Sequence, residues 1–117
     1  MAQTDQIAIQ LPKPRWKEGS SFNVPVHFRD RATSAAVTPT TVKYRIDCLT
    51  TGKAVADWST LSPSSAVTVP VSAAYNVIQS DANRTERKQI TVKTDDGLST
   101  QSQEAAVYTI ENLYGSP

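Results

Sequence analysis

The alternating segment from residue 42 to residue 48 constrains the fold of this chain more than any other feature. Apolar and charged residues take turns along it, in the order Val42, Lys43, Tyr44, Arg45, Ile46, Asp47 and Cys48. Because successive side chains of a β-strand point to opposite faces, this pattern predicts a strand with one face toward a core. Thr51-Gly52 follows and predicts a turn, since glycine readily adopts the positive φ of tight turns. This part of the chain therefore predicts antiparallel β-structure.

The same alternation predicts further strands on both sides of this segment. Phe22–Asp30 is the clearest, with alternate residues from Phe22 to Phe28 directed toward the core. Pro25 lies in its middle and provides no hydrogen-bond donor, so an edge position or a bulge is expected there. The remaining strands are expected at Gln6–Leu11, Ala54–Trp58, Ala66–Val71, Arg87–Thr94 and, within Thr100–Asn112, centred on Ala106–Ile110.

The core and the connections follow from the same pattern. Trp58, the largest apolar residue of its strand, is expected to fill the core. A short helical turn is expected within 72–78, with Val77 and Ile78 against the core, and Asp95-Asp96-Gly97 is a strong turn signal. About seven strands separated by turns, without a helix of ordinary length, predict an all-β fold, a sandwich of about seven antiparallel strands.

The length of 117 residues fits one domain that buries a core without disulfide bonds. We expect an N-terminal strand and an extended proline-containing arm over residues 1–21, the sandwich over 22–112 and a tail over 113–117. Cys48 is the only cysteine, which excludes an intrachain disulfide, and its position on the apolar side of its strand predicts a buried side chain. The lack of a disulfide favours assembly in a reducing cytoplasm.

The charge of the chain does not indicate a nucleic-acid partner or a membrane. The 12 basic and 11 acidic residues are interspersed and give a net charge of +1. Two short basic clusters, within Lys13–Lys17 and Arg84–Lys88, have acidic neighbours, so any contact with a polyanion is expected to be local and sensitive to salt. No apolar run approaches the roughly 18 residues of a membrane span, and the N-terminal residues lack the features of a signal peptide.

No constellation of residues predicts catalysis, a cofactor or a metal. His27 is the only histidine and falls on the polar side of its strand, where a solvated side chain is expected. A Ser-His-Asp mechanism would need it, and no serine stands in a Gly-x-Ser-x-Gly turn. Acidic residues at 95–96, with Glu86 or Asp81, allow a loop calcium site, but turn formation is their expected role. We therefore expect no enzyme, no cofactor and no metal.

Two segments outside the central strands are candidates for partner binding. The first is the extended arm, which either lies on a neighbouring molecule or crosses from one sheet to the other with its tryptophan packed locally. The second is the apolar C-terminal tail, which either completes the core or docks on a partner. An exposed edge strand adds a third way to bind. The candidate partner-binding residues are Leu11, Pro12, Pro14, Trp16, Leu113 and Tyr114.

The stretch from residue 39 to residue 108 resembles small immunoglobulin-like proteins encoded by tailed bacteriophages. The resemblance is carried by Pro39–Asp47, Thr51-Gly52, Val55 with Trp58, Ser64–Val71 and Lys88–Val92. It implies an immunoglobulin-like β-sandwich of about seven antiparallel strands. It also implies a non-enzymatic structural protein of the virion, assembled in the cytoplasm of the bacterial host.

In that role the chain resembles capsid decoration or head and neck accessory proteins, which contact the major capsid protein, a neck or tail protein or a second copy of themselves. The alternative is a tail- or fibre-associated adhesion module that binds bacterial-surface glycan. That role predicts exposed aromatic side chains, and the candidates Trp58, Tyr75 and Tyr114 are each expected to pack instead. Neither role involves nucleic acid or a membrane. The missing disulfide departs from antibody-type domains, so antigen-like recognition by loops is not carried over.

Overall fold

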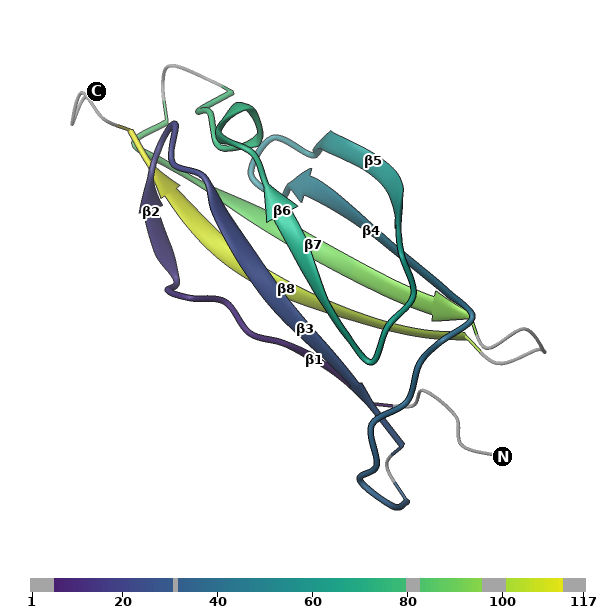
Figure 1. Ribbon diagram of the computed structural model, residues 1–117. Coiled ribbons are helices and arrows are strands. Elements are labelled where there is room, and N and C mark those ends of the chain that lie inside the picture. Colours follow the sequence, from purple (N-terminus) through teal and green to yellow (C-terminus); the bar gives the residue numbers. More distant parts are fainter. Residues whose placement is uncertain (1–5, 31, 80–82, 96–100, 113–117) are drawn as a thin grey trace.

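The computed structural model describes residues 6–30, 32–79, 83–95 and 101–112, which form two β-sheets packed face to face (Figure 1). In the described residues there are eight strands, one short 3-10 turn and an isolated bridge between Arg29 and Ala36. The elements are β1 Gln6–Ile9, β2 Arg15–Lys17, β3 Phe22–Arg29, β4 Thr41–Cys48, β5 Lys53–Leu61, β6 Ala66–Val71, η1 Ala73–Tyr75, β7 Thr85–Asp95 and β8 Gln101–Glu111. The expected all-β sandwich is confirmed, but the expected number of about seven strands is too low.

The two sheets share the N-terminal segment of the chain. Sheet A has the strand order β1-β3-β6, and sheet B has the order β2-β8-β7-β4-β5. Every neighbouring pair is antiparallel except β2 and β8, which run parallel. The arm therefore leaves sheet A after β1, crosses to the other sheet through residues 10–14 and joins sheet B as β2. The sequence pattern predicted the crossing as one of two alternatives but missed the strand Arg15–Lys17.

The core lies between the two sheets and follows the period-two pattern of the sequence. On β4 the alternate residues Val42, Tyr44, Ile46 and Cys48 are buried, as predicted. β3, β6, β7 and β8 contribute the same kind of inward row. The buried apolar cluster consists of Ile7, Val24, Val26, Phe28, Val42, Tyr44, Ile46, Val69, Val71, Ile90, Val92, Tyr108 and Ile110. Trp58 is not part of this cluster, so its expected role as a core residue is wrong.

Pro25 sits in the middle strand of sheet A, so the expected edge position is wrong. Its carbonyl accepts a hydrogen bond of 2.9 Å from the amide of Gln10, just beyond the end of β1. Because the N and C=O of one strand residue face the same side, the missing donor of Pro25 also faces Gln10. Only one hydrogen bond is lost, at the point where β1 ends. The expectation that β3 is not bonded on both sides throughout is therefore correct.

The connection after β6 closes one end of the sandwich. The predicted short turn is present as η1, whose start is capped by the Ser72 hydroxyl accepting a hydrogen bond from the Ala74 amide. Ile78 packs against the core as expected, whereas Val77 is 44% exposed and does not. The turn signal at Asp95-Asp96-Gly97 extends beyond the described residues.

Asn76, which ends η1, is wholly buried and fastens this connection to two other segments. Its Oδ1 accepts a hydrogen bond of 2.7 Å from the Tyr108 hydroxyl, and its Nδ2 donates one of 2.7 Å to the Ser20 carbonyl. Burial, with a smaller contribution from the charge of Cys48, raises the pKa of the Tyr108 phenol. The phenol therefore stays protonated and continues to donate to Asn76.

Candidate binding site on the outer face of sheet B

A β-bulge determines where the side chain of Trp58 points. Along the β4–β5 pair, Tyr44 opposes Ser59 and Ile46 opposes Ala56, so the single residue Arg45 faces both Asp57 and Trp58. The extra residue shifts the side-chain alternation of β5. Trp58 consequently lies with Arg45 on the outer face of sheet B rather than between the sheets.

Two cations hold the indole ring of Trp58 on this face. The guanidinium carbon of Arg45 lies 5.5 Å from the ring centroid, and the ammonium nitrogen of Lys93 lies 4.2 Å from it. Each contact of this kind contributes about 0.5–1 kcal/mol at an exposed site. Arg45 is itself fixed by Asp47, whose carboxylate accepts hydrogen bonds of 2.7–3.2 Å, and lies 3.9 Å from a carboxylate oxygen of Asp57. The hydrogen bonds to Asp47 raise the pKa of Arg45, which therefore remains charged.

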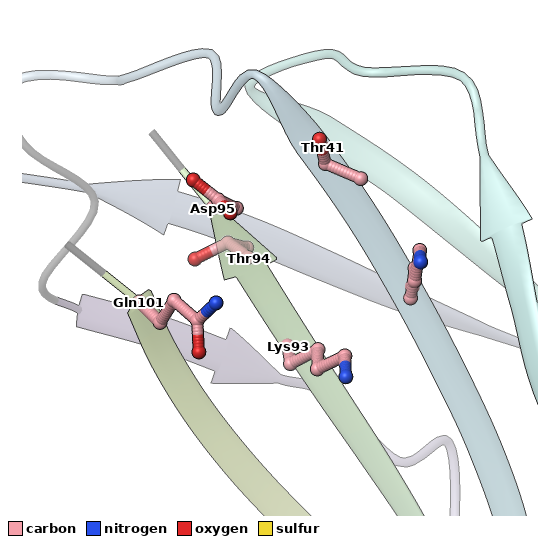
Figure 2. Close-up of a pocket in the computed structure, with 6 residues that line it drawn as sticks. Thr41, Lys93, Thr94, Asp95 and Gln101 are labelled. Carbon is pink, nitrogen blue, oxygen red and sulfur yellow. The ribbon is translucent and has the colours of Figure 1, made fainter. Parts of the chain in front are cut away.

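A small hollow of about 160 Å³ lies where β4 and β8 begin and β7 ends (Figure 2), and its lining residue Lys93 also contacts the ring of Trp58. Its lining residues are Thr41, Lys43, Lys93, Thr94, Asp95 and Gln101. Lys43 and Lys93 are direct cross-strand partners, and neither has a carboxylate within 4.0 Å among the described residues. Like charges placed directly opposite each other destabilise a sheet, so an anionic group bound between the two lysines would relieve this repulsion.

The rest of the outer face adds exposed apolar surface to this site. Val107 is 41% exposed on β8, where it pairs with Gln89 of β7. Ala105, two residues earlier, is also exposed and pairs with Thr91. Arg45 is the cross-strand partner of Thr91 on the other side. The face thus presents one aromatic ring, cationic groups and small apolar side chains.

The β6 edge of sheet A is less suited to binding a partner than the outer face of sheet B. β6 forms that edge, and the Phe28 amide donates to the Ser65 carbonyl just before it, at 3.0 Å. In an antiparallel pair, every second residue of a strand directs its backbone N and C=O toward the partner strand. Counted from Ser65, these are the odd-numbered residues of β6, so Pro70 directs its backbone N to the outer side of the edge. Pro70 has no N–H to donate there, so addition of a partner strand is disfavoured.

Among the residues considered for chemistry, Cys48 and Glu86 meet in the interior, where the thiol donates a weak hydrogen bond of 3.7 Å to Glu86 Oε1, but His27 lies in the other sheet. His27 is half-buried on β3, where it pairs with Ala8 and Ala66, and Cys48 is buried on β4 in the other sheet. Glu86, considered as a calcium ligand, is wholly buried and lies 3.4 Å from the Lys88 ammonium. The described part of the chain contains no group of three or more His, Cys, Asp or Glu residues placed to hold a metal. The outer face of sheet B remains the candidate binding surface.

The arm residues predicted to bind a partner are used partly by the fold itself. The ring of Trp16 stacks on Phe22 with centroids 4.1 Å apart and planes 7° apart, and its indole N–H donates to the Lys13 carbonyl at 3.0 Å. Leu11 also packs against the core, whereas Pro12 and Pro14 are exposed. Partner binding by the arm stays a prediction. Leu113 and Tyr114 lie outside the described residues.

Comparison with known protein families, with curated proteins and with solved structures finds no match to this chain. In the portion that the structure describes, none of the helical segments has the length and apolar character needed to cross a membrane.

Proposed function

We propose that this chain is an immunoglobulin-like, non-enzymatic structural protein of a tailed-phage virion. It decorates the capsid or joins head and neck components through protein–protein contacts, or contacts a second copy of itself. The strand arrangement supports the immunoglobulin-like assignment. Immunoglobulin strands are lettered in chain order. If β1 and β2 are two halves of strand A, then β3, β4, β5, β6, β7 and β8 are strands B, C, C′, E, F and G. Sheet A then has the order A-B-E and sheet B contains the order G-F-C-C′, as in that fold.

The observation that carries the proposal is the position of Trp58 and Arg45 together on an outer sheet face. Trp and Arg are the residue types that dominate binding energy in protein–protein interfaces, especially where they are preorganised. The bulge and the Asp47 contacts preorganise both side chains before any partner arrives. A protein that acts by coating or joining needs such a face and needs no reactive group.

Quantitative mass spectrometry of purified, nuclease-treated particles from the source culture tests this function. A ratio near that of the major shell protein supports a capsid coat, and a much lower ratio supports a neck or tail position. Absence from the particles contradicts the virion role. Particles made with Trp58→Ala should carry less of the chain, whereas Val77→Ala, at an exposed site in the connection between η1 and β7, should incorporate normally.

An adhesion module for bacterial-surface glycan is the second candidate, because Trp58 is an outward aromatic and not the core residue that its strand pattern predicted. Sugar rings stack on aromatic faces, and the neighbouring lysines suit acidic sugars. Titration of the intrinsic fluorescence with purified surface polysaccharide tests it. A response that Trp58→Phe abolishes supports glycan binding, and no response contradicts it.

A further inference from the structure

The fold brings together the two basic clusters that lie far apart in the sequence. β8 lies between β2 and β7 in sheet B. Thr109 of β8 pairs with Arg15 on one side and with Arg87 on the other. Two residues further along β8, Glu111 pairs with Lys17 on one side and with Thr85 on the other. The outer face of sheet B therefore carries basic side chains from both clusters on one three-strand strip, at the end opposite the hollow of Figure 2.

Most of the positive charge on this strip is not neutralised. Glu111 is shared between Arg15, at 3.9 Å, and Lys17, at 3.7 Å, and the side chains of these two cations are 57% and 63% exposed. Arg84 and Arg87 are exposed and have no carboxylate within 4.0 Å among the described residues. Four cations and one carboxylate thus leave a local charge of about +3. Lys88, the remaining residue of its cluster, is buried and takes no part.

Arg15, Lys17 and Arg84 line a hollow of about 450 Å³, larger than the one in Figure 2, and Arg87 lies across Thr109 from Arg15. The lining residues of this hollow are Arg15, Lys17, Arg84, Thr85, Glu111 and Asn112. The contacts of Glu111 are long and solvent-exposed, and ion pairs of this type contribute only about 0–1 kcal/mol. A stronger anion can therefore displace Glu111 from either cation at little cost.

We propose that this strip, formed by Arg15, Lys17, Arg84 and Arg87, is the docking surface for an acidic segment of a partner protein. The proposal rests on the structural function proposed above and names the chemistry of the partner. Carboxylates fit because the guanidinium group offers paired donors to them, and because Glu111 already occupies such a position between two cations.

Nucleic acid fits this surface less well. Non-specific binding of single strands combines cations with aromatic rings on which the bases stack. None of the described residues that line this hollow is aromatic, and the neighbouring Trp16 is stacked on Phe22. The strip also spans only three strands, which is about 10 Å across at the usual strand spacing.

The test measures fluorescence anisotropy of a labelled octaglutamate peptide with the purified full chain at low and at moderate salt. We expect binding that weakens as salt increases and that becomes about tenfold weaker in the double variant Arg84→Gln/Arg87→Gln. The matched control, Arg29→Gln/Lys53→Gln, removes two exposed charges on β3 and β5 that belong to neither hollow, and should bind like the unmodified protein. Both arginines are exposed, so circular dichroism and the urea midpoint should not change.

Three outcomes overturn the proposal: no binding of the peptide, an equal loss of binding in the control, or tighter binding of a single-stranded oligonucleotide with the same number of charges. These outcomes are separate from the particle experiment. If the peptide does not bind but the chain is found in particles, only the acidic partner is rejected. If the peptide binds but the chain is absent from particles, only the virion role is rejected.

Discussion

The ammonium group of Lys88 lies 3.4 Å from the carboxylate of Glu86, and both side chains are wholly buried inside one end of the sandwich. The ammonium also donates a hydrogen bond of 3.0 Å to the Val77 carbonyl. The carboxylate accepts bonds from the Gln79 amide at 2.7 Å and from the Asn83 side chain at 2.9 Å. Both charges are thus satisfied by each other and by the connection after η1, which they fasten to β7.

Removal of one partner of this pair should strongly destabilise the protein. Lys88→Met leaves the Glu86 carboxylate buried without its cation, and breaking such a pair typically costs about 3–5 kcal/mol of the free energy of unfolding. Urea unfolding measures the loss. In the double variant Glu86→Gln/Lys88→Met no charge remains buried, so its loss should be smaller than the sum of the two single losses. Additive losses would show that the two charges do not depend on each other.

Substitution of the two tryptophans should reduce stability to different extents. Trp16 attaches the arm to the core by stacking on Phe22. Trp16→Ala should therefore lower the free energy of unfolding by about 2–4 kcal/mol. Trp58 lies outside the core, and Trp58→Ala should cost about 1 kcal/mol or less, mainly from its contacts with cations. Urea unfolding of both variants checks this. A larger loss for Trp58→Ala than for Trp16→Ala would place Trp58 in the core after all.

The core of the sandwich could be predicted from the sequence because local alternation and burial agree on β3, β4, β6 and β7. Val24, Val26 and Phe28 are buried in the strand where period two placed them. Cys48 was correctly predicted to be buried for the same reason. In these strands each side chain faces the side that a regular pleat dictates.

The candidate site could not be predicted, because it depends on features that alternation does not encode. The bulge at Asp57–Trp58 reverses the expected direction of Trp58 and arises only from pairing with β4. The inward direction of Lys88 was hidden by its charge, since a lysine is rarely buried without a partner. The meeting of Arg15 with Arg87 across Thr109 depends on strand order, which no local pattern specifies.

The turn after β4 needs the glycine at position 52. Gly52 has φ of +74°, as its turn signal predicted, and open space surrounds the position of a Cβ atom. Gly52→Ala should therefore destabilise through backbone strain alone, by about 1–2 kcal/mol. Gly52→Asn should cost less, because asparagine tolerates left-handed conformations better. Thermal unfolding ranks the variants, and an alanine variant as stable as the unmodified protein would contradict the strain.

Stability should decrease at alkaline pH because of Tyr108. Burial raises the pKa of its phenol in the folded protein above the value of about 10 expected in the unfolded chain. Below about pH 10 the phenol is protonated in both states, and the stabilising contribution is complete. As the pH increases further, only the unfolded chain loses this proton, so the free energy of unfolding should fall by up to about 1.4 kcal/mol per pH unit. Urea unfolding between about pH 8 and about pH 11 measures this slope.

Tyr108→Phe should be less stable at neutral pH, because it loses the bond to Asn76, but should show a flatter slope. An unchanged slope in Tyr108→Phe would contradict the assignment.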